Sequence, residues 1–136
     1  MIDLTPVEEH NGIFYKRDDL YAPYENFITG GKIRQCRDLV ERNLDFIHDK
    51  CDSTIATAAS VHSPQSPIVS RVAQEFGLKS IIGFGNTTVE KSLKHKMMRK
   101  CKELGSELVV LSESQGFNNV LYSNLNKLNE TRPMFK

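Results

Sequence analysis

The stretch "STIATAASVHSPQSPIVSRVAQEFGLKSIIGF", residues 53–84, decides the fold of this chain. Its first six residues, "STIATA", predict a buried strand, and its last five, "SIIGF", predict a second strand. The segment between them predicts a complete helix, with Ser66 as the N-cap, Pro67 at the first helical position and Gly77 beyond the end. Strand, helix and strand in this order predict a parallel pair joined by a right-handed crossover.

The same alternation continues toward the C-terminus. "TTVEKSLKHKMMRKCKELG" (87–105) predicts one helix, with Thr87 and Glu90 spaced as a capping box, and "ELVVL" (107–111) predicts a third strand. A last, weaker helix is expected to present Phe117, Leu121, Leu125 and Leu128 on one face. The predicted fold class is therefore α/β, with a parallel sheet and flanking helices in three layers.

On the N-terminal side, "GIFYKRDD" begins as a short strand over 13–16, and "LYAPYENFITGG" is typical of a loop. Apolar residues then recur every three or four positions from Lys32 to about His48, which predicts one amphipathic helix. Three units are expected. They are an N-terminal segment with the Lys32 helix (1–50), a small α/β domain (51–115), and a C-terminal helix and tail (116–136).

Composition excludes several classes of protein. The 136 residues carry a net charge of +1 and 39% hydrophobic residues, a balance with no nucleic-acid signature and no sign of disorder. No apolar run is long enough to span a membrane. The three cysteines form no CxxC pair, which favours a reducing cytoplasm, and the four histidines have no metal-ligand spacing, so no metal site is expected.

Two loops follow predicted parallel strands, where open α/β sheets bind ligands. The loop "ASVHSPQS" (59–66) is rich in hydroxyls and precedes a helix N-terminus, which favours a carboxylate or phosphate; the alternative is a capped polar connection. The loop "GFGNTT" (83–88) resembles half of a dinucleotide fingerprint, with Glu113 as a ribose ligand. The alternative there is a plain strand-to-helix turn.

Lys32 follows a glycine pair at the start of its predicted helix. Glycines let a flat ligand approach the backbone, and a lysine amine can form a Schiff base with a ligand carbonyl. The alternative is an ordinary solvated helix lysine. Asp18 and Asp19 could likewise act as paired carboxylates, or only as salt-bridge partners in a solvated turn.

Taken together, "TPVEE", "GIFYKRDDL" and "ITGGKIRQ" resemble the N-terminal region of pyridoxal-phosphate enzymes of the tryptophan synthase β type, which are fold type II. The nearest likeness is to the aminocyclopropane-carboxylate deaminase and D-cysteine desulfhydrase branch. Residues 59–84 are similar to the family's small domain, in which a serine-rich loop binds the substrate carboxylate. The resemblance covers nearly the whole chain, which would correspond to the N-terminal portion of such an enzyme.

The resemblance implies a pyridoxal 5'-phosphate cofactor and a lyase or deaminase activity on a small amino acid or amino-acid conjugate. Lys32 would hold the cofactor as a Schiff base and move protons at the substrate α-carbon. Substrate contacts would come from Ser60, His62, Ser63 and Gln65, and Gln65 would also face the cofactor ring.

The chain departs from the family in three ways: Gly31 replaces an asparagine, Pro64 replaces a ring-contacting asparagine, and the downstream glycine-rich phosphate cradle is absent from the sequence. These departures keep a second hypothesis open, a non-catalytic binding or interaction module descended from the family. Either way, a homo-oligomer or a complementary chain is expected.

Overall fold

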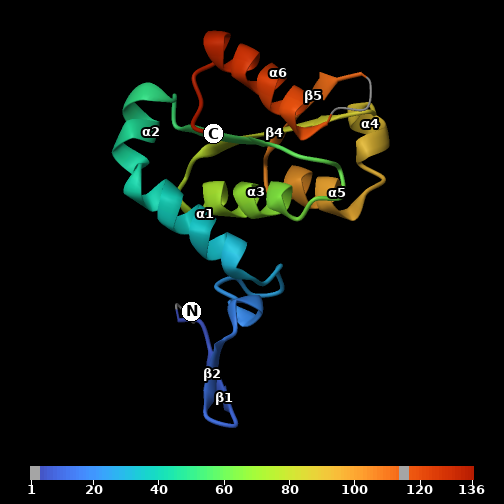
Figure 1. Cartoon of the computed structure of the whole chain (residues 1–136). Helices are drawn as coiled ribbons and strands as arrows, with labels where there is room; N and C mark the ends of the chain where they lie inside the picture. Colours follow the sequence, from blue (N-terminus) through green and yellow to red (C-terminus); the bar gives the residue numbers. More distant parts are fainter. Residues whose placement is uncertain (1–3, 114–116) are drawn as a thin grey trace.

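A computed structural model of the chain, which describes residues 4–113 and 117–136, contains two separate sheets (Figure 1). Strands β3 (Thr54–Ala58), β4 (Lys79–Gly85) and β5 (Glu107–Ser112) form a parallel sheet in the order β3-β4-β5. Strands β1 (Val7–His10) and β2 (Ile13–Lys16) form an antiparallel hairpin. The predicted α/β class is confirmed, as are the three parallel strands and the strand over 13–16; β1 was not predicted.

Helices cover both faces of the parallel sheet (Figure 1). On one side lie α1 (Gly31–Arg42), α3 (Gln65–Glu75) and α5 (Lys96–Glu103), and on the other lies α6 (Asn118–Thr131). The short helices α2 (Leu44–Lys50) and α4 (Val89–Ser92) lie at the two ends of the domain, and a 3-10 turn covers Asp18–Leu20. The result is the expected three-layer arrangement.

Three apolar clusters hold the helices against the sheet and against one another. Under α6, Leu121 and Leu125 pack on Ala56 and Ile81 of the sheet. A second cluster lies under α5 and contains Ile82, Phe84, Met98 and Cys101. A third joins α1 to α3 and to β3, and it contains Ile33, Val40, Ile55, Ile68 and Val72. All five residues of β3 are buried, because the strand is covered on both faces, as parallel strands usually are.

The C-terminal segment adds a further connection to the sheet. Phe135 forms a parallel bridge with Ile55 on the free edge of β3. The Ala56 amide donates to the Phe135 carbonyl at 2.7 Å, and the Phe135 amide donates to the Thr54 carbonyl at 2.9 Å. The chain therefore leaves β3 toward α3 on one face and returns to the outer edge of β3 after α6 on the other face.

Both long helices predicted from sequence are interrupted. The helix predicted from Lys32 to His48 ends at Arg42, because Asn43 leaves the helical conformation (φ −114°, ψ 12°) and its side-chain amide donates to the Leu39 carbonyl. The helix predicted over 87–105 divides into α4 and α5, and the Arg99 guanidinium donates to two carbonyls released at the break. In both places a side chain satisfies the freed backbone carbonyls.

Three local predictions were also wrong. Helix α3 begins at Gln65, so Ser66 lies inside it, and Ser63 Oγ accepts the Gln65 amide instead. Thr88, not Thr87, caps α4 by accepting the Lys91 amide. Phe117 is 76% exposed and does not share the buried face of α6. The two cap errors are shifts of one or two residues, which is the usual uncertainty of helix ends.

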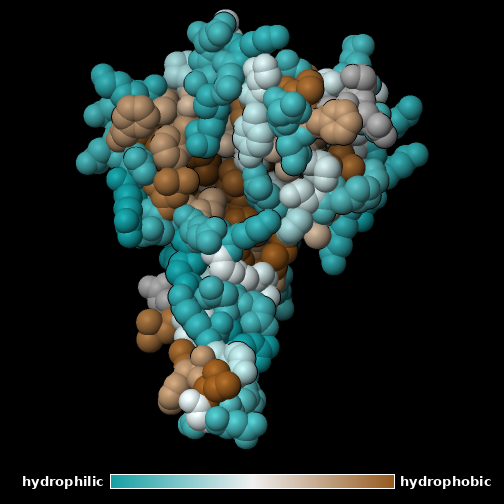
Figure 2. All heavy atoms as spheres, viewed as in Figure 1, coloured by the Kyte–Doolittle hydropathy of each residue, from teal (hydrophilic) through white to brown (hydrophobic). Residues whose placement is uncertain are grey.

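The β1–β2 hairpin projects away from the parallel-sheet domain (Figure 1). Its turn is formed by Asn11 and Gly12, which both have positive φ, as tight hairpin turns require. Large apolar side chains remain exposed on it, including Phe14 at 72%, and hydrophobic residues are visible on this projection in Figure 2. No helix in the described part of the chain is long and apolar enough to cross a membrane.

Candidate functional site

A cavity of about 310 Å³ lies beside β3 at the point where the chain changes faces of the sheet. The connection after β3 passes to α3 on one face, whereas the segment paired with its outer edge arrives from α6 on the other. Open α/β sheets bind ligands at such switch points. Figure 2 shows hydrophobic side chains in the recess at the centre of this face.

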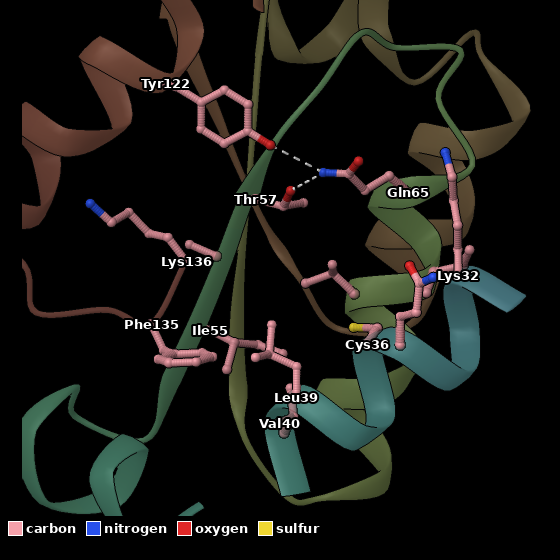
Figure 3. A pocket seen from close by; sticks show the side chains of 14 residues that line it. Lys32, Cys36, Leu39, Val40, Ile55, Thr57, Gln65, Tyr122, Phe135 and Lys136 are labelled. Carbon is pink, nitrogen blue, oxygen red and sulfur yellow. Dashed lines mark hydrogen bonds between the residues drawn. The ribbon is translucent and has the colours of Figure 1, made fainter. Parts of the chain in front are cut away.

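The polar groups of the cavity come from five separate segments (Figure 3). Gln65, in the first turn of α3, donates through Nε2 to Thr57 Oγ1 at 2.5 Å and lies 3.5 Å from the hydroxyl oxygen of Tyr122 on α6. Lys32, an exposed residue in the first turn of α1, lines the edge of the cavity, and Lys136 lines its far side. The apolar wall is formed by Cys36, Leu39, Val40, Ile55, Ile68 and Phe135.

The glycine pair before Lys32 has a conformational role. Gly30 has φ +130° and ψ 163°, a backbone conformation that residues with a side chain rarely adopt. A β-carbon on Gly31 would lie 3.3 Å from Asp18 Cβ and 3.4 Å from Asp18 Oδ2. The pair therefore turns the chain into α1 and lets Asp18 pack over the first turn, in which Lys32 lies.

The charged residues of the N-terminal segment stabilise this turn. Asp18 Oδ1 accepts from Arg34 at 2.7 Å, and Arg34 also donates to the hydroxyl of Thr5. Asp19 pairs with Arg17 instead, and this ion pair lowers the pKa of Asp19. The two aspartates thus serve as salt-bridge partners, the second of the two interpretations, and Asp18 holds the start of α1 through Arg34.

A second group of contacts fixes α1 against α3. Arg37 donates to Glu75 at 2.8 and 3.0 Å, and Glu75 also accepts from the Tyr24 hydroxyl. Burial acts to raise the pKa of Glu75, but the hydrogen bonds from Arg37 and Tyr24 outweigh it, so its pKa lies below the usual range. Burial and the Glu75 carboxylate raise the pKa of Tyr24. This joint holds α1, which carries Lys32, against the C-terminal end of α3, the helix that begins at Gln65.

The structure brings together only some of the predicted site residues. Lys32 and Gln65 line the same cavity, whereas Ser60, His62 and Ser63 do not line it. The Ser63 amide donates to the Ser60 carbonyl, and Ser63 Oγ accepts the Gln65 amide, so the loop forms a tight polar turn before α3. His62 instead makes an edge-on ring contact with His95, with 4.4 Å between ring centroids.

The "GFGNTT" loop has structural reasons for its glycines. A β-carbon on Gly83 would overlap the Leu111 side chain, and one on Gly85 would lie 3.1 Å from Leu121 Cδ2. Glu113 does share a cavity of about 530 Å³ with the residues that follow Gly85. However, α4 after this loop has only four residues, too few to build the helix dipole that binds a pyrophosphate.

Sequence analysis missed five side chains of the cavity that carry a polar atom or a thiol: Gln35, Cys36, Thr57, Tyr122 and Lys136. The sequence pattern predicts only a buried strand around Thr57. For Cys36 it predicts only a position on the apolar face of a helix. Burial raises the pKa of the Cys36 thiol to about 11. Tyr122 and Lys136 are distant from Lys32 along the chain, so no local pattern could have indicated them. Among residues 4–113 and 117–136, no cluster of His, Cys, Asp and Glu could hold a metal.

Comparison with known proteins gives one informative likeness. No protein-family model matches the chain. The chain is similar to the O-seryl-dTMP PLP-dependent decarboxylase of Salmonella phage ViI, with 28% identity over 135 residues. The alignment covers 90% of this chain but 29% of that protein, so the chain spans less than a third of its curated relative. The likeness supports similarity to pyridoxal-phosphate-dependent enzymes in general.

Proposed function

We propose that this chain forms the lysine-bearing part of a pyridoxal-phosphate-dependent lyase of fold type II, close to the deaminase and desulfhydrase branch. One observation carries the proposal. Lys32 and Gln65, from the first turns of two different helices, line one cavity at the switch point of the sheet. The similarity to a PLP-dependent decarboxylase supports the same cofactor.

The residues of the cavity fit the reactive end of this cofactor. Lys32 supplies a primary amine for the aldehyde carbon, and Gln65, Thr57 and Tyr122 supply an amide and hydroxyls around it. The flat aromatic ring would lie against the apolar wall, between Ile55 and the α1 side chains. A cavity of this size, apolar with few polar groups, is typical of small-molecule sites. Lys136 is the other cationic group in this cavity and would face the phosphate.

The bound cofactor would supply an electron sink for the substrate α-carbon. Lys32 would hold the cofactor and then carry a proton to or from that carbon. Gln65 would orient the substrate carboxylate together with the backbone amides at the start of α3, because a helix N-terminus favours negative charge. Ser60, His62 and Ser63 would close the substrate side of the site. The joint between Arg37 and Glu75 would hold α1, which carries Lys32, against α3.

The proposed substrate is an amino acid carried on a larger group. The relative's printed name gives O-seryl-dTMP, a serine attached to a nucleotide, as the group that it decarboxylates. A conjugate suits this site because the cavity is open, so an attached group can extend past the loop at 59–64. The reaction class is bond cleavage at the α-carbon: decarboxylation, elimination or deamination.

A trapping experiment tests the cofactor proposal without measuring activity. The protein is incubated with pyridoxal phosphate, reduced with borohydride and digested, and mass spectrometry locates the pyridoxyl group. We expect it on the peptide that contains Lys32, with loss of the visible absorption band in Lys32→Ala. Lys127→Ala removes an exposed lysine of α6 and is the matched control. Labelling spread over surface lysines, with an unchanged Lys32→Ala spectrum, would refute the proposal.

A non-catalytic module remains the second candidate, and one observation favours it. The glycine pair, which could have admitted a ligand, is explained by the turn at Gly30 and the packing of Asp18 over Gly31. A module of this kind would fold fully without cofactor and would not gain thermal stability from it. A rise in melting temperature with pyridoxal phosphate, lost in Lys32→Ala, would argue for the enzyme.

We also propose that a second polypeptide, either another copy or a complementary chain, covers the projecting hairpin. Two-stranded hairpins are marginal by themselves, and this one exposes Val7, Ile13 and Phe14. Analytical ultracentrifugation of the wild type and of Phe14→Ser tests this. If both proteins are monomeric even at high concentration, another copy of this chain does not cover the hairpin, and only the proposal of a complementary chain remains.

A further inference from the structure

The helices α4 and α5 carry a concentrated positive charge. Between residues 91 and 102 the chain has six Lys or Arg residues and no acidic residue, and we call these six residues the basic ridge: Lys91, Lys94, Lys96, Arg99, Lys100 and Lys102. The rest of the chain then has twelve basic against 17 acidic residues. The nearly neutral total therefore hides a strong charge asymmetry, which whole-chain composition cannot reveal.

The ridge faces outward because α5 is amphipathic. Met98 and Cys101 are buried against the sheet, and Lys96, Arg99 and Lys100 occupy the opposite side at spacings of three and one. These three cations line a cavity of about 560 Å³ between α5 and the loop at 26–28. Glu103 is the one acidic residue lining it.

Much of this charge is unpaired. Within residues 4–113 and 117–136, no acidic side chain forms a salt bridge with Lys91, Lys94, Lys96 or Lys102. Lys100 lies 3.7 Å from Glu103, and Arg99 is bonded to backbone carbonyls. By contrast, Arg17, Arg34, Arg37, Arg42, Lys79 and Arg132 all have carboxylate partners.

The ridge adjoins both elements of the candidate site. His95, inside the ridge, contacts His62 of the loop between β3 and α3, with 4.4 Å between their rings. The loop at 26–28, across the cavity from α5, leads directly to Gly30 and Lys32. A group attached to an amino acid bound at Lys32 would therefore reach the ridge after passing His62.

We infer that the basic ridge binds the phosphate backbone of a nucleic-acid duplex that carries the amino-acid substrate. This inference rests on the proposed function in naming what the duplex carries, but the binding surface stands on its own charges. The eight residues of α5 extend about 12 Å, which matches about three to four phosphates along one duplex strand. A site for a single phosphate would need several cations that converge on one point, whereas the cations of the basic ridge are spread along the chain from residue 91 to residue 102. A single strand would need a row of stacking aromatics, whereas residues 91–102 contain no Phe, Tyr or Trp and the cavity beside α5 has one aromatic lining residue, Phe27.

Binding of a fluorescein-labelled DNA duplex, followed by anisotropy against salt, tests the inference. With about four phosphates neutralised by Lys91, Lys94, Lys96 and Lys102, the ridge lysines that form no salt bridge among the described residues, affinity should fall about 150-fold between about 50 and about 200 mM salt. The double variant Lys94→Gln, Lys96→Gln should retain two contacts, so its affinity should fall only about 12-fold over the same range. The control variant Lys50→Gln, Lys127→Gln removes two lysines from α2 and α6 and should behave as wild type.

The outcomes are separable from those of the trapping experiment. Failure of pyridoxal phosphate to label Lys32 would overturn the proposed function, whereas duplex binding needs no cofactor. Equal salt dependence in the ridge variant and the control, or no binding even at about 50 mM salt, would overturn the ridge as a nucleic-acid surface. Competition by free dTMP as strong, per phosphate, as by unlabelled duplex would replace the duplex with a mononucleotide. Circular dichroism confirms that each variant is folded.

Discussion

Replacing Glu75 with alanine tests whether the joint between α1 and α3 stabilises the candidate site. The substitution removes two hydrogen bonds from Arg37, at 2.8 and 3.0 Å, and one from Tyr24. It also removes the Glu75 carboxylate from the Arg37 guanidinium, whose side chain is 17% exposed and which also donates to the Tyr21 hydroxyl. The perturbation is local, because Glu75 is the last residue of α3 and lies outside the cavity.

The magnitude follows from the burial of the pair. Breaking a fully buried ion pair costs about 3–5 kcal/mol, and a hydrogen bond to a charged group contributes about 1.5–3 kcal/mol. Because the Glu75 side chain is 21% exposed, water can partly replace the lost partners. We therefore expect the free energy of unfolding of Glu75→Ala to fall by about 2–4 kcal/mol.

The pH dependence of stability provides an independent signature. The pKa of Glu75 is lower in the folded chain than in the unfolded one, so its ionisation stabilises the fold above the unfolded pKa of about 4.3. This contribution is lost as pH falls through the lower, folded pKa. The stability advantage of wild type over Glu75→Gln should thus be constant from neutral pH to about pH 5 and shrink below about pH 4.

Urea unfolding followed by circular dichroism measures both effects. Asp38→Ala is the control, because it breaks an exposed pair with Arg42, with side chains 52% and 76% exposed, and should cost no more than about 0.5 kcal/mol. A cost for Glu75→Ala as small as that of Asp38→Ala would refute this account of the joint. So would a wild-type advantage over Glu75→Gln that persists unchanged into acid.

Three further predictions concern the backbone and the thiols. Gly30→Ala should lower the free energy of unfolding in urea by about 1–3 kcal/mol, because the backbone at φ +130° is strained for any residue with a β-carbon. An unchanged midpoint of urea unfolding would contradict this. Gly83→Ala should cost about 1–3 kcal/mol, and adding Leu111→Ala should recover part of that cost in a double-mutant cycle; strictly additive losses would disprove the predicted overlap. Cys36 should react slowly with Ellman's reagent at pH 8, because burial raises its pKa to about 11, and faster in urea; equal rates would show an accessible thiolate.

Local patterns predicted the elements better than their ends. The three parallel strands and the strand over 13–16 were found from apolar runs and their punctuation. The interruptions at Asn43 and after Ser92 were missed, because apolar periodicity continues through both of them. Hydrogen bonds from Asn43 and Arg99 to backbone carbonyls stabilise these breaks, and such contacts have no signature in the pattern.

The site shows the same contrast. The residues around Lys32 could be recognised from sequence because Gly30, Asp18 and Arg34 act within one short segment, where spacing and residue type carry the information. Their mutual contacts explain why these residue types occur together: Arg34 pairs with Asp18, and a β-carbon at residue 31 would lie only 3.3 Å from Asp18 Cβ. The division into three units and the cytoplasmic location stay predictions.

By itself, the sequence determined the α/β class, the parallel strands and a lysine at the start of a helix, because each depends on residues close together in the chain. Only the tertiary structure decided which groups surround that lysine. Phe135 pairs with Ile55, and Tyr122 reaches Gln65, across 80 and 57 positions of sequence. Such contacts form because α6 buries its apolar face on the sheet. No local pattern in the sequence shows which distant segments this burial will bring together.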